Sequence, residues 1–226
     1  MRTVWQAAIE IQTGQPRRLR LEQLGLADLS TDVLVELQAL YARSYYNSHI
    51  YERFVEDLDL RPEVFRLFLV RDDEVEGRVV GARLIESKHH TFVDYFGFPP
   101  IHGKRFCVAP EQRGRRIGQH IVEACNAYVF DELDLPVIFG ESNEVGALSM
   151  HGREGALYLT DSIVRHFPRN DQESALTFFA EYLTNPRLRG LRLPVGDGVQ
   201  FVYCRDASTT RLFHNHGYVT KDELLA

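Results

Sequence analysis

The chain has 226 residues, of which 44% are hydrophobic and 26% are charged, and its formal net charge is −6. This length and composition are typical of a globular protein with a substantial core, so we predict a single domain over residues 1–226. The acidic balance argues against a nucleic-acid partner, and no apolar run is long enough to cross a membrane. The N-terminal segment lacks the apolar stretch of a secretory signal, which favours the cytoplasm.

The first quarter of the chain predicts a strand followed by a helix. Residues 18–24 alternate between polar and apolar types, as expected of a first strand. Ser30 or Thr31 can cap a helix, and apolar residues then recur at helical spacing as far as Tyr41. The aromatic, polar stretch 45–51 follows, and it is interpreted either as packing by amphipathic rings or as one wall of a substrate cleft.

The middle of the chain predicts more strands and one long helix. Val, Phe and Leu dominate 64–70, a charged turn occupies 72–77, and 78–85 returns as the second strand of a hairpin. The elements expected after this hairpin are a strand ending at 101–109, a helix over 117–131 and a short buried strand, parallel to its neighbour, at 135–140.

The last third predicts mainly helices and ends in a strand–helix–strand pattern. Asn170 and Glu173 have the spacing of a capping box, and the helix they begin stops before Pro186. The other expected elements are a helix within 148–158, a strand at 199–204, a helix that includes 212–213 and a final strand near 217–218.

The most informative stretch is 106–118, which reads FCVAPEQRGRRIG. An apolar run stops at Pro110, a turn with three arginines and a glycine follows, and a helical pattern begins at Ile117. A helix that begins at such a turn directs free backbone N–H groups and the positive end of its dipole at one point, which favours an anion such as phosphate. Gly114 and Gly118 would let the ligand approach the backbone closely.

Two common phosphate loops are excluded, because the stretch has neither the Gly-Lys-Ser/Thr ending of a P-loop nor the G-x-G-x-x-G of a dinucleotide site. The segment from Val108 to Gly118 instead resembles motif A of the GNAT superfamily of N-acetyltransferases, whose Q/R-x-x-G-x-G/A loop holds the pyrophosphate of acetyl-CoA. In that register Arg113 is the first position and Gly118 the last. Arg116 stands where the family usually has its middle glycine, although Gly114 remains available for the turn.

The resemblance implies an α/β fold of the GNAT type, with a mixed central sheet flanked by helices, and acetyl-CoA as co-substrate without a metal. Residues 156–198 would then be an insertion, mostly helical, that covers the substrate side. The residues expected to bind the cofactor are Phe106, Cys107, Val108, Arg113, Gly114, Arg115, Arg116, Ile117, Gly118 and Asn143. A β-bulge at the end of the central strand would free an N–H group to polarise the thioester carbonyl.

Two segments resemble the family's second motif, in which a strand ends near an Asn and the next helix reads A-x-x-L-Y-x-x-x-G-F. The first, 143–155, lies in the expected place, after the strand that follows motif A, and has His151 in place of the Tyr that donates a proton to the departing thiolate. The second, 206–218, has the better pattern but places Phe213 there, and a phenyl ring has no proton to donate. Chain order favours the first, because consecutive elements are usually neighbours.

Three residues are candidates for proton transfer. His102 falls where many family members project a general base, and histidine titrates near neutral pH, although a solvated loop histidine would fit equally well. Glu141 is the alternative base. His151 is the candidate acid, against the simpler interpretation of a structural histidine.

The sequence therefore predicts an acyl-CoA-dependent N-acyltransferase that moves an acetyl group to a small-molecule or protein amine. Three alternatives remain: a GNAT-like decarboxylase or S-acyltransferase, including one that uses an acyl carrier protein; an acyl-CoA-binding module without turnover; and an unrelated anion-binding fold with no preference for CoA over simple phosphate. The sequence names neither the acceptor nor the oligomeric state, so an oligomer stays open. No metal is expected, because His-Glu-x-x-His and paired cysteine motifs are absent.

Overall fold

The structure is a computed structural model, and it divides the chain into two compact units, unit 1 (Met1–Tyr128) and unit 2 (Val129–Ala226). Each unit is described by itself, and the single domain predicted from the sequence stays a prediction. The structure describes residues 2–10, 16–44, 63–75, 77–87, 97–98, 101–167, 171–191, 193 and 198–226, with backbone only at 2–10 and 16–17. The aromatic stretch 45–51 lies outside these residues.

Unit 1 is built on a sheet in which every neighbouring pair of strands is antiparallel, in the order β1-β2-β3-β4-β5. The expected strand at 18–24 and the expected hairpin are confirmed, but the first strand is β1, which the sequence did not predict. Its backbone pairs along its length with β2, and such pairing needs no apolar period. The strands are β1 (Arg2–Glu10), β2 (Pro16–Leu24), β3 (Arg66–Asp72), β4 (Arg78–Ser87) and β5 (Ile101–Val108).

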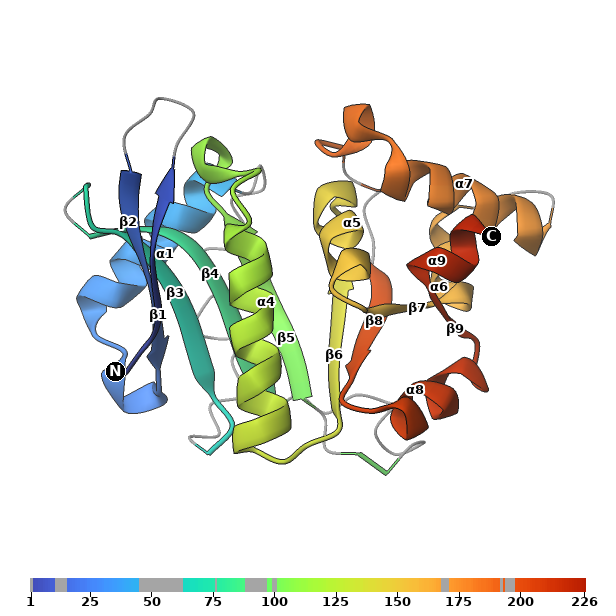
Figure 1. Cartoon of the computed structure of the whole chain (residues 1–226), viewed down its shortest axis with the longest axis horizontal. Helices are drawn as coiled ribbons and strands as arrows, with labels where there is room; N and C mark the ends of the chain where they lie inside the picture. The colour runs from blue at the N-terminus through green and yellow to red at the C-terminus, as the bar shows by residue number, and fades with distance from the viewer. Residues whose placement is uncertain are drawn as a thin grey trace. The chain divides into compact units, whose positions relative to one another are not determined.

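Two helices pack on this sheet, α1 (Thr31–Ser44) and α4 (Ile117–Ala127), and Figure 1 shows α4 crossing in front of it. The α1 residues Leu37, Leu40 and Tyr41 are buried, as the predicted apolar stripe requires. The helix expected over 117–131 is shorter, because α4 gives way to the π-helical turn η3 (Tyr128–Glu132). Two short 3₁₀ turns complete the unit, η1 (Leu26–Asp28) and η2 (Pro110–Gln112).

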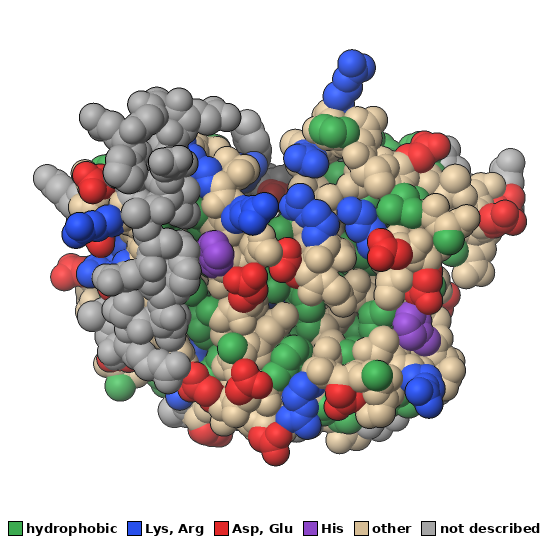
Figure 2. All heavy atoms as spheres, viewed as in Figure 1, with side chains coloured by type: hydrophobic (Ala, Val, Ile, Leu, Met, Phe, Trp, Pro, Cys, Tyr) green, Lys and Arg blue, Asp and Glu red, His purple; other side chains and the backbone are tan. Residues whose placement is uncertain are grey.

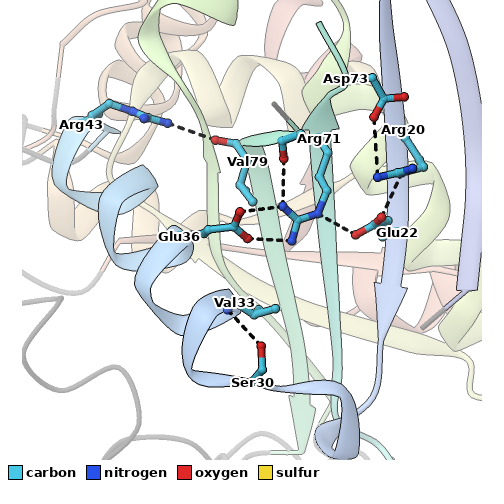
Figure 3. A network of polar contacts seen from close by, with 10 residues as sticks. Arg20, Glu22, Ser30, Val33, Glu36, Arg43, Arg71, Asp73 and Val79 are labelled. Carbon is cyan, nitrogen blue, oxygen red and sulfur yellow. Dashed lines mark hydrogen bonds and ion pairs between the residues drawn. The ribbon is translucent and has the colours of Figure 1, made fainter. Parts of the chain in front are cut away.

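A polar network fastens α1 to β2 and β3 (Figure 3). The guanidinium of Arg71 on β3 donates two hydrogen bonds, of 2.9 and 2.7 Å, to the carboxylate of Glu36 on α1. It also donates a 2.8 Å bond to the buried carboxylate of Glu22 on β2. Arg20 lies on the outer side of Glu22, with its Nε 2.9 Å from that carboxylate. The network explains why charged residues occur on the α1 face of the sheet.

Unit 2 also contains an antiparallel sheet, with strand order β6-β8-β7-β9. The strand expected at 135–140 is β6 (Val137–Ser142), and its neighbour within the unit, β8 (Val199–Cys204), runs antiparallel to it. β7 (Leu157–Leu159) joins β8 to β9 (Tyr218–Thr220). Because β8 lies between β6 and β7, the chain leaves the sheet after β7 and returns to fill the space between two earlier strands.

The helices of unit 2 are α5 (Val145–Arg153), α6 (Thr160–His166), α7 (Gln172–Thr184), α8 (Ala207–His214) and α9 (Lys221–Leu225), with the 3₁₀ turn η4 (Pro186–Leu188). The predicted insertion at 156–198 was mostly helical, and α6 and α7 confirm this for the described residues. The predicted start of the insertion, residue 156, was wrong, because residues 157–159 form the strand β7 of the sheet. The connecting segment is therefore 160–198.

Local details at helix ends differ from the sequence prediction. The cap of α7 is Asp171, whose carboxylate accepts a 2.7 Å bond from the N–H of Ser174, whereas the sequence assigned the cap to Asn170, which lies outside the described residues. A shift of one residue preserves the acidic first turn and the chemistry of the cap. The helix expected within 148–158 is α5, which ends at Arg153.

Candidate functional site

The loop between β5 and α4 is held to the rest of unit 1 by Gln112. The side chain of Gln112 is buried and donates a 3.4 Å hydrogen bond to Asp72 at the end of β3. Arg115 donates to the other end of the same amide. The sequence analysis did not single out Gln112, and the only available signal was an amide beside a Gly/Arg turn. Gln112 therefore links the loop to the end of β3.

Arg113 turns back toward the sheet instead of extending into solvent. Its guanidinium donates to the carbonyl of Val108 at 3.2 Å and to the carbonyl of Ser44 at 3.4 Å. These bonds tie the loop to the end of β5 and the end of α1. The side chain of the first residue of motif A thus supports the loop's shape, and its own N–H donates to Pro110 O at 3.3 Å.

Gly114 and Arg116 both have backbone conformations that favour glycine. Gly114 has φ of 81°, and a Cβ built there would meet no atom of the described residues within 4 Å, so among these residues the space beside it is open. Arg116 has φ of 60° and ψ of 7°, the left-handed conformation, at the N-cap of α4. The departure from the family motif thus falls at a residue whose backbone favours glycine, and the arginine accommodates it at the cost of strain.

The first turn of α4 provides the anion-binding features that the sequence predicted. The first backbone bond of the helix runs from His120 N–H to Arg116 O, which leaves the N–H groups of residues 117–119 pointing out of the helix end. Among the described residues no side chain caps this end, and its first turn contains no acidic residue. Lys and Arg side chains are visible around this upper end of α4 in Figure 2. Dipole, N–H groups and charge all favour an anion here.

Gly118 has a different role from the one expected. A Cβ at this position would lie 2.8 Å from Cζ of Phe106, so the ring of Phe106 occupies the space that a ligand was predicted to use. Gly118 lets α4 pack closely on β5, which places the start of the helix against the strand. Close approach of a ligand to the backbone is therefore open at Gly114 and not at the Cβ side of Gly118.

A β-bulge interrupts β5 before the loop. Cys107 pairs with Ala82 and Lys104 pairs with Leu84, so two residues of β5, Arg105 and Phe106, lie opposite the single residue Arg83. Arg105 has φ of 50°, a conformation usual for the first residue of one type of bulge, where glycine is preferred. The sequence predicted a bulge at the end of this strand, and the structure places it within the strand. The extra residue leaves backbone groups of the bulge outside the ladder.

His102 lies in β5, three residues before the bulge, and it is not the solvated loop histidine that the sequence left as an alternative. It is buried and pairs in register with Glu86 of β4. Glu86 is fully buried, and its carboxylate lies 2.5 Å from Nζ of Lys104. Alternate residues of a strand share a face, as do opposite residues, so His102, Lys104 and Glu86 form one polar cluster. The sequence analysis missed Glu86 and Lys104, although charges at alternate strand positions could have indicated them.

Three predicted residues belong to unit 2. Glu141 is exposed on β6, and Asn143 follows this strand. The backbone around Asn143 is covered by the end of the connecting segment, because Leu193 N–H donates to Asn143 O at 2.7 Å and Val145 N–H donates to Leu191 O at 3.2 Å. This segment therefore fixes the junction between β6 and α5.

His151 is buried on α5 among aromatic side chains of β8. Its Nδ1 lies 2.6 Å from the hydroxyl of Tyr203, and its ring stacks on Phe201 with the ring centres 4.2 Å apart. The bond joins two groups that each carry a titratable proton. The structure thus gives His151 a partner for proton exchange, while its role as an acid stays a prediction.

The structure explains why two segments resembled the second motif. Each one is a strand followed by a helix, a glycine with positive φ and a short strand. In the first, α5 leads to Gly155 with φ of 84° and then to β7. In the second, α8 leads to Gly217 with φ of 81° and then to β9. A glycine in this conformation is a common end for a helix, so the pattern is shared for structural reasons.

A search with family models matches residues 32–154 to the acetyltransferase (GNAT) family, which is more than half of the chain. The chain belongs to this family. The match contains motif A and 143–154 of the first candidate for the second motif, and it ends before 206–218, which supports the first candidate. GNAT enzymes generally use acetyl-CoA as co-substrate, so membership supports an acyltransferase.

Solved structures agree on the fold. An agmatine N-acetyltransferase in its apo form is 14% identical with a TM-score of 0.52, and the alignment covers 81% of this chain and 99% of that one. A GNAT acetyltransferase from Staphylococcus aureus Mu50 is 10% identical with a TM-score of 0.50, covering 82% of this chain and 99% of that one. These likenesses confirm the predicted fold class and, at such identities, nothing finer. No curated protein sequence gives a significant match.

The structure also bears on metal binding, membrane spans and the cysteine thiols. In the described ranges, no group of three or more His, Cys, Asp and Glu side chains is placed to hold a metal ion, and no helix is both long and apolar enough to span a bilayer. Cys107 and Cys125 are buried, whereas Cys204 is only partly buried. Burial raises the pKa of Cys125 and that of Cys204 to about 12, which keeps both thiols protonated at neutral pH.

Proposed function

We propose that the chain is an N-acyltransferase that moves an acetyl group from acetyl-CoA to an amine. The observation that carries the proposal is the start of α4, where outward N–H groups, Gly114 in an open position and neighbouring arginines form an anion site within a GNAT motif A. The pyrophosphate of acetyl-CoA is the anion that this motif would hold. Residues 113–118 would bind it mainly through backbone N–H groups.

The strand before the loop would serve the reacting end of the cofactor. Backbone groups of Phe106, Cys107 and Val108 would contact the pantetheine arm, and an N–H of the bulge would donate to the thioester carbonyl. The amine attacks the carbonyl carbon, a C–N bond forms, and the C–S bond breaks. The electron pair leaves on the thiolate of CoA, and the attacking nitrogen gives up a proton.

His102 is the proposed acceptor of that proton. It lies on β5 close to the bulge, and the buried carboxylate of Glu86 on the same face can stabilise the imidazolium that forms. Glu141 remains the alternative base, and His151 remains the proposed source of the proton for the thiolate. Both are tested with the same assay as His102.

The first experiment is thermal unfolding with acetyl-CoA, malonyl-CoA, CoA and plain pyrophosphate. A ligand at about a hundred times its dissociation constant adds roughly 2.7 kcal/mol to the free energy of unfolding and raises the midpoint by a few degrees. We expect a shift with the CoA compounds and none with pyrophosphate at the same concentration. The absence of any shift with acetyl-CoA would exclude the proposed function.

The second experiment measures release of the CoA thiol in the presence of primary amines. We expect His102→Ala to lower turnover by roughly 10²–10⁴-fold and to remove the acid limb of the pH–rate profile. The matched control is His120→Ala, because His120 is partly exposed on α4 and its Nδ1 lies 3.1 Å from the carboxylate of Glu123. Equal activity of the two variants would remove His102 from the mechanism, and carbon dioxide release from malonyl-CoA would favour the decarboxylase instead.

A further inference from the structure

Tyr41 on α1 reaches the bulge of β5. Its side chain is buried, with 1% of its surface exposed, and its hydroxyl donates a 3.0 Å hydrogen bond to the carbonyl oxygen of Arg105. Arg105 is the bulge residue with positive φ. The bond therefore joins the core of the helix layer to the one residue of β5 whose conformation departs from that of a strand.

The conformation of Arg105 needs external support. A side chain with a Cβ loses about 1–2 kcal/mol in the left-handed region, and such residues persist where their surroundings hold them. Glycine would remove this cost, and this chain has arginine. The hydrogen bond from Tyr41 acts on the carbonyl of the strained residue itself, so it directly opposes relaxation of the bulge to a regular strand.

A second bond fastens the same part of α1 to the strand beside the bulge. Arg43 donates from Nη2 to the carbonyl of Val79 on β4 at 3.0 Å (Figure 3). The end of α1 is thus attached to both strands between which the register shifts. Burial raises the pKa of Tyr41 well above its usual value, so its hydroxyl keeps its proton and remains a donor at any working pH.

We infer that Tyr41 is a positioning residue that holds the bulge of β5 in the shape needed to donate a backbone hydrogen bond to the acyl carbonyl. The role of the bulge toward the acyl carbonyl rests on the proposed function. The statement that Tyr41 holds the bulge in its shape does not. Tyr41 touches no reacting atom in this scheme. It acts through Arg105, and its removal should affect the bulge before it affects the rest of unit 1.

The first test is amide hydrogen exchange in Tyr41→Phe, with Tyr128→Phe as the matched control. Tyr128 is equally buried, and its hydroxyl also donates to backbone carbonyls, at 3.1 Å to Val64 and 3.3 Å to Glu63. We expect exchange at residues 105–107 to accelerate roughly fivefold in Tyr41→Phe, the effect of one neutral hydrogen bond, and to stay at the wild-type rate in the control. Equal protection of 105–107 in both variants would overturn the inference.

The second test compares acetyl-CoA with CoA, which lacks the acyl carbonyl. We expect Tyr41→Phe to reduce the preference for acetyl-CoA over CoA by roughly fivefold, while Tyr128→Phe preserves it. An unchanged preference in Tyr41→Phe would show that Tyr41 is only structural. If the wild type bound neither compound, the proposed function would fail, and the exchange experiment would still decide whether Tyr41 holds the bulge.

A double variant keeps the test decisive if Tyr41→Phe folds poorly. Arg105→Gly lowers the cost of positive φ, so the bulge depends less on the hydrogen bond. We expect Tyr41→Phe combined with Arg105→Gly to recover both folding and the preference for acetyl-CoA relative to Tyr41→Phe alone. A double variant no better than the single one would contradict the role of Tyr41 in holding Arg105.

Discussion

The two halves of the sheet in unit 1 differ in how regularly their strands pair. In the half made by β2 and β3, the strands pair regularly, and Arg71 is joined to Glu22, Glu36 and the carbonyl of Gly77 (Figure 3). Each bond satisfies a group that is buried or partly buried. No residue described in these two strands has a positive φ outside glycine. This half is a stable frame.

The half made by β4 and β5 is irregular. Within the described part of the chain, three residues other than glycine have positive φ, and two of them, Arg105 and Arg116, lie at the bulge and at the start of α4. The bulge takes backbone groups out of the ladder, and one of them, the Arg105 carbonyl, accepts the bond from Tyr41 instead. Charge pairs occur in both halves, but backbone strain is concentrated beside the candidate ligand sites. Substitutions in the two halves should therefore affect different measurements.

The largest expected effect on binding comes from Gly114→Val. A β-branched residue strongly disfavours φ of 81°, so the loop would change shape at the point where a phosphate should approach the backbone. We expect loss of measurable acetyl-CoA binding, detected by calorimetry on folded protein.

The control for this variant is Gly77→Val in the hairpin between β3 and β4. Gly77 also has positive φ, 69°, and a Cβ there would also meet no atom within 4 Å. Both variants should lose about 1–2 kcal/mol of stability from the backbone alone. Only Gly114→Val should lose affinity, and equal affinity in the two variants would refute the assignment of the anion site.

The next effect is on stability. Arg71→Met would leave the carboxylate of Glu22, which is 2% exposed, with Arg20 as its remaining described partner, so we expect a loss of about 3 kcal/mol in urea unfolding. Arg20→Met removes the outer, 32% exposed partner of the same carboxylate and should cost less than about 1 kcal/mol. Acetyl-CoA affinity should be unchanged in both. Equal losses of stability would mean that burial does not distinguish the two arginines.

The smallest effect is expected at Arg116. Arg116→Gly relieves the left-handed conformation but gains freedom in the unfolded chain, so the net stabilisation should be no more than about 1 kcal/mol. Arg116→Ala removes the same charge and keeps the strain, so it separates the two contributions. Thermal unfolding of both variants would show this, and a less stable glycine variant would argue against strain at this residue.

Several elements and the candidate site could be predicted from local sequence patterns. The helical stripe of α1, the hairpin of β3 and β4, and the strand–turn–helix of motif A were predicted because each depends on neighbours within a few residues. The site followed from the same local information: glycine, arginine and a helix start adjoin in the sequence. The position of the cap at Asp171 was off by one residue, since Asn and Asp cap helices equally well.

The amino-acid sequence alone determined the family and most of the elements, and it predicted the candidate anion-binding loop, because periodicity, capping and motif spacing are encoded within short segments. Only the tertiary structure decided that β8 enters between β6 and β7, that Phe106 fills the space at Gly118 and that the bulge lies at Arg105. It also decided the partners of His102 and the contact of Tyr41. Each of these joins residues far apart in the chain, and a pairing across such a separation leaves no period in the sequence that could predict it.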